Sequence, residues 1–145
     1  MVSMVENSKN CVALTFSRCL GANIHSTINY LKQRGFIRTG KDLENDTYMD
    51  AALDGLKVAK VCTKAGWSSA CSLIRGKGEG RYFCVNHGPS DASKKFVVHA
   101  FTVHCSRHGG LAVHGNNQDT STSRYESVLK ANHRVTVHGP FPRAH

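Results

Sequence analysis

Residues 82–110, YFCVNHGPSDASKKFVVHAFTVHCSRHGG, decide the fold, because chemically distinctive side chains recur there at regular intervals. Cys84 and His87 are separated by two residues, Cys105 and His108 are separated by two residues, and seventeen residues lie between the pairs. A gap of two residues lets both side chains of one tight turn reach the same ion, and two such turns supply the four ligands of tetrahedral zinc. The spacing therefore predicts a structural zinc site made by these four residues.

The same residues also have a simpler interpretation. Cys105 falls on the same face of an alternating run as Val103, so it could be a small buried hydrophobe, and His108 could be a loop residue. The glycine and proline residues that follow the two pairs supply the turns that a zinc knuckle needs. They would equally well end two plain strands.

Residues 96–105 form the clearest strand in the chain, because they are dense in Phe and Val and apolar on both faces. Such a run predicts a strand in the centre of a sheet. From residue 101 onward, the pattern apolar-x-Val-His-small occurs three times, and short strands that each finish in His would gather these histidines at sheet ends if the strand directions allow it. The histidines of the three copies are His104, His114 and His138.

Length and composition predict a globular protein with a basic surface. The chain has 145 residues, enough for one compact unit, and 40% of them are hydrophobic and 20% charged. Lys and Arg number 19 against 10 Asp and Glu, which favours polyanionic partners, with DNA or RNA ahead of an anionic membrane surface. The alternative is a solvated basic face that has no partner.

The amino-terminal residues MVSMVENSKNCVALTF do not combine a basic leader with a long apolar core, so we expect no secretory signal. No apolar run approaches the roughly 20 residues that span a bilayer. The sequence thus predicts an intracellular protein of the cytoplasm or nucleus, with no membrane partner. Its six cysteines are then expected to be thiols or metal ligands, with disulfides as the alternative if the chain is an excised fragment.

Two short amphipathic helices are predicted near the amino terminus. Apolar residues recur at helical spacing between Cys11 and Leu20, and Gly21 then interrupts the pattern. Asn23 is suited to cap a second helix, which carries apolar residues on one face and ends at Gly35.

The stretch TFSRCLGANIHSTINYLKQRGFIRTG, residues 15–40, resembles a winged helix-turn-helix DNA-binding domain. In that family the second helix presents polar side chains to the major groove, and a hairpin wing follows it. The resemblance implies a reading surface at or near the side chains of Asn23, His25, Ser26, Thr27 and Asn29. It implies phosphate contacts from Lys32, Arg34, Arg38 and Lys41. A packed helical hairpin without a role in nucleic-acid binding is the alternative.

A third helix is predicted from about residue 48 to residue 64. It would carry Lys57, Lys60 and Lys64 on one face, where they either follow a phosphate backbone or are simply solvated. Trp67, the only tryptophan, is expected to anchor the core.

Residues 75–81 alternate glycine with charge, which predicts a flexible basic loop that either wraps a phosphate or forms a plain hairpin tip. Tyr82 and Phe83 follow it, and an aromatic pair beside basic residues is suited to stacking on unpaired bases. This region adds four residues to the candidate nucleic-acid-binding set: Arg75, Lys77, Arg81 and Tyr82.

The predicted fold class is α+β, with a helical, helix-turn-helix-like part followed by a small, mainly antiparallel sheet that the zinc site would stabilise. Within the second part we expect a loop at 116–123 and a short helix at 125–132. The predicted segments are a flexible amino terminus at 1–10, the helical part at 11–74, the basic loop and strands at 75–138, and an extended, proline-rich tail at 139–145.

Together these features predict a small, basic, non-enzymatic protein that binds DNA or RNA in a regulatory role and holds a structural zinc ion. One alternative is an adaptor that binds another protein, such as a virus-encoded antagonist of a host factor. Another is a histidine-dependent phosphodiesterase. His25 and His104 each begin a His-x-Ser/Thr tripeptide that resembles the motifs of the two-histidine phosphoesterases, in which one imidazole acts as base and the other as acid.

Overall fold

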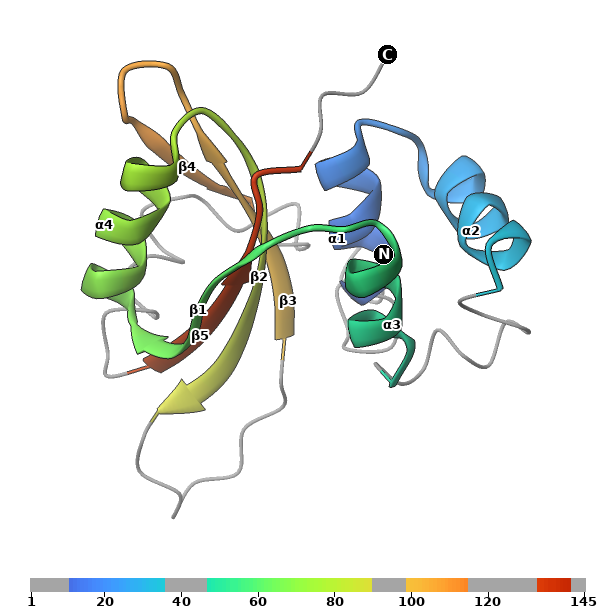
Figure 1. Cartoon of the computed structure of the whole chain (residues 1–145), viewed down its shortest axis with the longest axis horizontal. Coiled ribbons are helices and arrows are strands. Elements are labelled where there is room, and N and C mark those ends of the chain that lie inside the picture. Colours follow the sequence, from blue (N-terminus) through green and yellow to red (C-terminus); the bar gives the residue numbers. More distant parts are fainter. Residues whose placement is uncertain (1–10, 36–46, 90–98, 115–132, 142–145) are drawn as a thin grey trace, which may run out of the picture.

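The computed structural model describes residues 11–35, 47–89, 99–114 and 133–141. These residues form four helices and one five-stranded sheet (Figure 1), so the predicted α+β class is confirmed. The strands are β1 (Lys60–Gly66), β2 (Gly80–Pro89), β3 (His99–Cys105), β4 (Leu111–His114) and β5 (His133–His138). Neighbouring strands are antiparallel, in the order β1-β5-β2-β3-β4.

The strand predicted from the Phe- and Val-rich run is β3, which lies between β2 and β4. It pairs with β2 from Gly80 opposite Cys105 to Asn86 opposite His99. An interior position agrees with the apolar character of both of its faces, because both faces are covered. Residues 96–98, where the predicted strand begins, lie outside the described residues.

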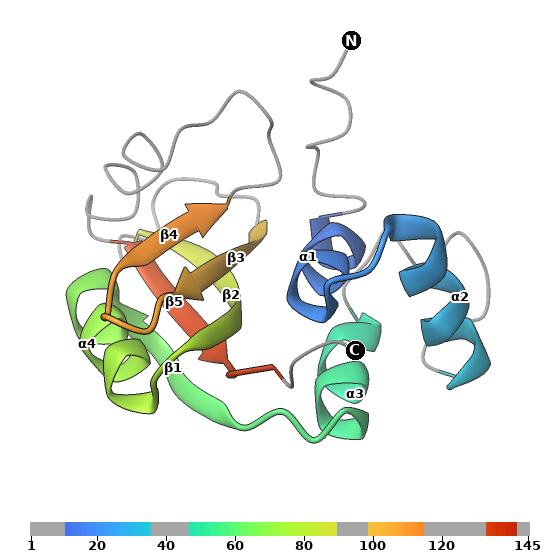
Figure 2. The same ribbon diagram turned by 90° about the horizontal axis from the view of Figure 1, so that it is seen from above.

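Helices cover both faces of the sheet (Figures 1 and 2). α4 (Trp67–Lys77) lies on one face, whereas α1 (Cys11–Leu20) and α3 (Thr47–Gly55) lie on the other, with α2 (Ile24–Gln33) beyond α1. The two predicted amino-terminal helices are therefore confirmed. The predicted division into a helical part and a later strand part is only approximate, because β1 precedes α4.

Local hydrogen bonds explain where the first two helices end and begin. The Asn23 side chain accepts a hydrogen bond from the Ser26 backbone N–H at 2.8 Å, which satisfies a donor left open at the start of α2. Gly21, with φ 71°, turns the chain after α1 and donates its N–H to the Arg18 carbonyl at 3.3 Å. The predicted cap and the predicted helix interruption are both confirmed.

The third helix is shorter than predicted. α3 ends at Gly55, and Lys57 has the left-handed φ of 58°, which is incompatible with a continuing right-handed helix. Lys60 and Lys64 lie on β1, an edge strand, so the predicted lysine-bearing helical face is wrong. The segment between α3 and α4 contains the β-branched residues Val58, Val61 and Thr63, a residue type that favours strands.

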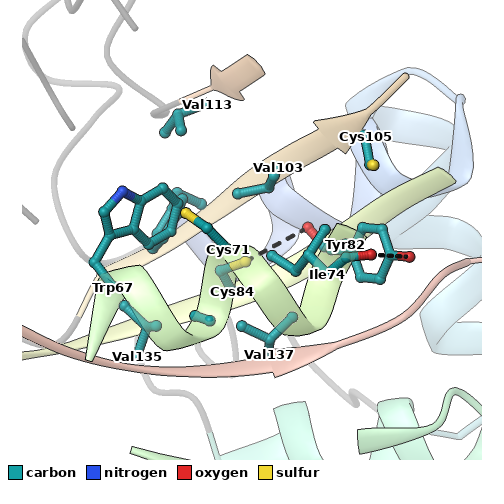
Figure 3. Packing of buried hydrophobic residues seen from close by; sticks show 12 residues of the cluster. Trp67, Cys71, Ile74, Tyr82, Cys84, Val103, Cys105, Val113, Val135 and Val137 are labelled. Atoms are coloured by element: carbon teal, nitrogen blue, oxygen red, sulfur yellow. Dashed lines mark hydrogen bonds between the residues drawn. The ribbon is translucent and has the colours of Figure 1, made fainter. Parts of the chain in front are cut away.

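The sheet separates two hydrophobic cores. Alternation along β2 sends Tyr82 and Cys84 toward α4, and Phe83 and Val85 toward α1 and α3. Figure 3 shows the α4-side core, in which Trp67 is only 4% exposed, so its predicted role as a core anchor is confirmed.

The second core is built around Phe83. Its ring centroid lies 4.6 Å from that of Phe16 and 6.5 Å from that of Phe141. Phe141 is buried, and its backbone N–H donates to the Arg81 carbonyl at 2.8 Å. Residues 139–141 form neither helix nor strand, which agrees with the predicted lack of regular structure, but Phe141 is packed into the core.

Part of what the sequence predicts lies outside the described residues. This applies to the flexible amino terminus, the loop at 116–123, the helix at 125–132, the wing strand after Gly35, and the phosphate contacts of Arg38 and Lys41. Within the described ranges, no helix combines the length and the apolar character needed to cross a membrane.

Candidate anion-binding site

A pocket opens where the end of α1 meets β2, β3 and β4. Its volume is about 380 Å³, which falls in the range of sites that hold small ligands. α1 and the turn after it contribute Ser17, Arg18, Gly21 and Ala22 to the lining. The strands contribute Arg81, Thr102, His104 and His114.

Strand register brings the polar side chains of the sheet together. Thr102 lies opposite His114, and His104 lies opposite both Arg81 on β2 and Ala112 on β4. His104 and His114 are therefore diagonal neighbours on adjacent antiparallel strands and share one face of the sheet. Basic side chains from three strands thus line the same pocket.

Two arginines connect α1 to this part of the sheet. The Arg18 guanidinium donates to the His114 carbonyl at 3.4 Å, and the Arg81 guanidinium donates to the Arg18 carbonyl at 3.2 Å. The Arg18 carbonyl, which also accepts the Gly21 N–H, lies in the last turn of α1, where carbonyls lack their usual partner four residues on. These bonds hold both guanidinium groups at the pocket.

The charged side chains of the pocket are all basic, since no Asp or Glu among the described residues lines it. The pKa of His114 is lowered, first by partial withdrawal from water and then by the charges of Arg18, His104 and Arg81. Burial also lowers the pKa of Arg18. Positive charges crowded in this way repel one another, and an anion would relieve the repulsion. The electrostatics of the pocket therefore favour an anionic ligand.

Cys19 lies beside the pocket, with its Sγ 4.0 Å from Oγ1 of Thr102. Burial raises the pKa of this thiol to about 12, although its hydrogen bond to Thr102 and the charges of Arg81 and Arg18 act in the opposite direction. The thiol stays protonated at neutral pH, so Cys19 does not neutralise the two arginines.

The residues predicted to read bases lie on or next to α2, outside the pocket lining. Thr27 is 1% exposed, and its hydroxyl donates to the Asn23 carbonyl at 2.9 Å, so its predicted contribution to a reading surface is wrong. The other members of the described set are exposed: Asn23, His25, Ser26, Asn29, Lys32 and Arg34.

The predicted basic loop is divided between the end of α4 and the start of β2. Arg75 and Lys77 lie in the last turn of α4, and Arg75 Nε donates to the Gly109 carbonyl at 3.0 Å. Both side chains are exposed, as are those of Lys57, Lys60 and Lys64, and none of these five lines the pocket.

The predicted aromatic platform is wrong. Tyr82 and Phe83 are both fully buried, on opposite faces of β2. The Tyr82 hydroxyl donates to the Gly78 carbonyl at 2.6 Å, and burial raises its pKa to about 12. Neither ring is accessible to a base, and Arg81 is the residue of this segment that lines the pocket.

The two predicted zinc-binding cysteines are not brought together. Cys84 lies opposite Phe101 in the β2–β3 register, whereas Cys105 lies opposite Gly80. Their positions are four residues apart along the strands, or about 13 Å, whereas two sulfur ligands of one zinc ion lie within about 5 Å. Figure 3 shows the two thiols in the α4-side core, well separated. Burial also raises the pKa of the Cys84 thiol, which disfavours the thiolate that zinc binds.

The two histidines of the predicted zinc set lie elsewhere. His87 Nε2 is 2.8 Å from Oγ1 of Thr136 on β5, and His108 is exposed in the turn between β3 and β4. No three His, Cys, Asp or Glu side chains of the described ranges lie close enough to hold a metal ion. The simpler interpretation is confirmed, because Cys105 is 1% exposed and His108 is a turn residue.

Sequence reasoning missed Arg18 as a pocket residue and reached His104 and His114 only through a repeat. The apolar-x-Val-His pattern was the useful signal, since two of its three histidines line the pocket. The third, His138, is 8% exposed and lies opposite Phe83 on β2. The tripeptide interpretation chose the wrong partner for His104, because His25 lies on α2, outside the lining.

Comparison with known protein families finds no model that matches the chain. None of the curated proteins with which the chain was compared matches it either.

Proposed function

We propose that the chain binds nucleic acid and that the pocket between α1 and the sheet receives a phosphate group of the nucleic-acid backbone. The observation that carries this proposal is the lining, in which Arg18, Arg81, His104 and His114 converge without a carboxylate among the described lining residues. Guanidinium groups match the geometry of phosphate oxygens and bind them through parallel N–H donors.

The remaining surface supports a polyanionic ligand in preference to a small isolated anion. The chain carries a formal net charge of +9, and exposed cations lie on several elements besides the pocket. Such charges attract a phosphate backbone over a distance of about one Debye length, roughly 8–10 Å at moderate salt. The pocket would then position the nucleic-acid strand, while the surrounding cations raise its association rate.

We expect Arg81→Ala to weaken the binding of a single-stranded oligonucleotide about tenfold at moderate salt, because one charge-assisted contact is lost. The slope of log K against log salt should fall by about 1. Fluorescence anisotropy over a salt series measures both quantities. Arg107→Ala, which removes the same charge from the exposed turn between β3 and β4, should change the affinity less than twofold.

Arg34→Ala tests whether nucleic acid binds at the pocket or at the α2 surface implied by the helix-turn-helix resemblance. Arg34 is exposed at the end of α2, with its guanidinium carbon 5.4 Å from the centroid of the Tyr30 ring. A loss of affinity in Arg34→Ala but not in Arg81→Ala would move the binding surface to α2. Unchanged affinity in both variants would contradict phosphate binding at either place and favour the protein-binding adaptor.

A further inference from the structure

His104 and His114 have the arrangement that acid–base catalysis at phosphorus requires. They are diagonal neighbours on β3 and β4, and such positions lie about 7–8 Å apart on one face of an antiparallel pair. A phosphate group placed between two imidazoles at that spacing has an oxygen directed toward each of them. Both side chains are exposed and both line the pocket, so a ligand can reach them.

We propose that this pocket cleaves RNA, with His104 and His114 as the acid–base pair and the 2′-hydroxyl of the substrate as the nucleophile. The inference rests on the proposed function, because it requires a phosphodiester in the pocket. It goes further in naming the substrate class, a strand that carries 2′-hydroxyl groups, and in assigning the chain an activity.

The bond changes balance without a metal ion or a redox partner. The imidazole of His114 takes the proton of the 2′-hydroxyl, and O2′ forms a bond to phosphorus. The bond between phosphorus and O5′ breaks, and O5′ receives a proton from the imidazolium of His104. The products are a 2′,3′-cyclic phosphate and a strand with a free 5′-hydroxyl. Neutral His104 and protonated His114 are then returned to their starting states by exchange with solvent.

The surroundings of His114 favour its role as the base. Partial withdrawal from water and the charges of Arg18, His104 and Arg81 lower the pKa of His114, so its neutral, proton-accepting form predominates at neutral pH. Arg18 and Arg81 stand where they can stabilise the additional negative charge that develops on the phosphorane oxygens.

The test uses the full chain, a fluorescently labelled RNA oligonucleotide in EDTA, and two strands of the same sequence, one of DNA and one of 2′-O-methyl RNA. We expect cleavage of the RNA alone, with a 2′,3′-cyclic phosphate identified by mass spectrometry. His104→Gln and His114→Gln should each reduce the rate about 100-fold or more, the usual contribution of a general acid or base. His108→Gln, in the exposed turn after β3, should cleave at the normal rate.

Binding of the 2′-O-methyl strand, measured in parallel, separates this inference from the proposed function. If that strand binds but the RNA is not cleaved, or if the two glutamine variants cleave as fast as the unmodified protein, the catalytic inference is overturned while phosphate binding stands. Cleavage of the DNA strand would overturn the role of the 2′-hydroxyl. If neither strand binds and no RNA is cleaved, both proposals fall together.

Discussion

Replacing Phe83 by alanine is expected to lower the free energy of unfolding by about 3–5 kcal/mol, the usual cost of removing a fully buried phenyl ring. Phe83 is 0% exposed, and its ring packs against those of Phe16 on α1 and Phe141 after β5. Its loss leaves a cavity at the point where three separate parts of the chain meet. Urea unfolding followed by circular dichroism measures the change.

The matched control for this prediction is Leu73→Ala. Leu73 is on α4 and is 44% exposed, so its truncation should change the stability by no more than about 0.5 kcal/mol. If Phe83→Ala proved as mild as Leu73→Ala, the docking of α1 and of the segment after β5 onto the sheet would be contradicted. Phe83→Leu should recover most of the lost stability, because it refills most of the volume.

Gly139→Ala is expected to destabilise the chain by about 3 kcal/mol or more, through backbone strain and overpacking together. Gly139 has φ 150°, a value that residues with a side chain rarely adopt. An added Cβ would also lie 2.5 Å from Cδ2 of Tyr82 and 3.1 Å from the carbonyl oxygen of Arg81. Tyr82 is rigidly packed in the α4-side core, so it cannot move aside cheaply. Thermal unfolding measures the loss.

Gly76→Ala serves as the opposite case. Gly76 lies within α4, has φ in the ordinary range, and an added Cβ would meet no other atom within 4 Å. Alanine should therefore stabilise the chain by about 0.5–1 kcal/mol, because it has the higher helix propensity. A large loss of stability in Gly76→Ala together with none in Gly139→Ala would contradict the packing at the end of β5.

Local patterns predicted the elements that depend on nearby residues. Apolar spacing and the Asn23 cap were sufficient for α1 and α2, because the hydrogen bonds that start and end a helix connect residues three or four apart. The run before Cys105 was sufficient for β3, since apolar residues on both faces indicate an interior strand.

The same local patterns failed where distant partners decide the structure. The segment after α3 has a helical arrangement of lysines. β1 forms there nevertheless, because it pairs with β5, more than 60 residues later, with Lys60 opposite His138. The lack of regular structure at the proline-rich end was predicted from sequence, but the packing of Phe141 on Phe16 and Phe83 was not. Neither outcome can be calculated without knowing which segments meet.

The candidate sites show the same division. The two Cys-x₂-His spacings suggested a metal centre, but strand pairing places Cys84 and Cys105 at different levels of one core. The repeated Val-His pattern indicated only two of the pocket residues, His104 and His114. Arg18 and His114 are 96 residues apart in the chain, and a hydrogen bond from guanidinium to carbonyl joins them.

By itself, the sequence determined the α+β class, the first two helices, the interior strand, the burial of Trp67 and the basic character of the surface. These properties follow from composition and from short-range periodicity. Only the tertiary structure decided which titratable groups are neighbours, because strand register and the docking of α1 set those distances. A shift of one residue in the β3–β4 register would move His114 to the other face of the sheet and so remove it from the pocket.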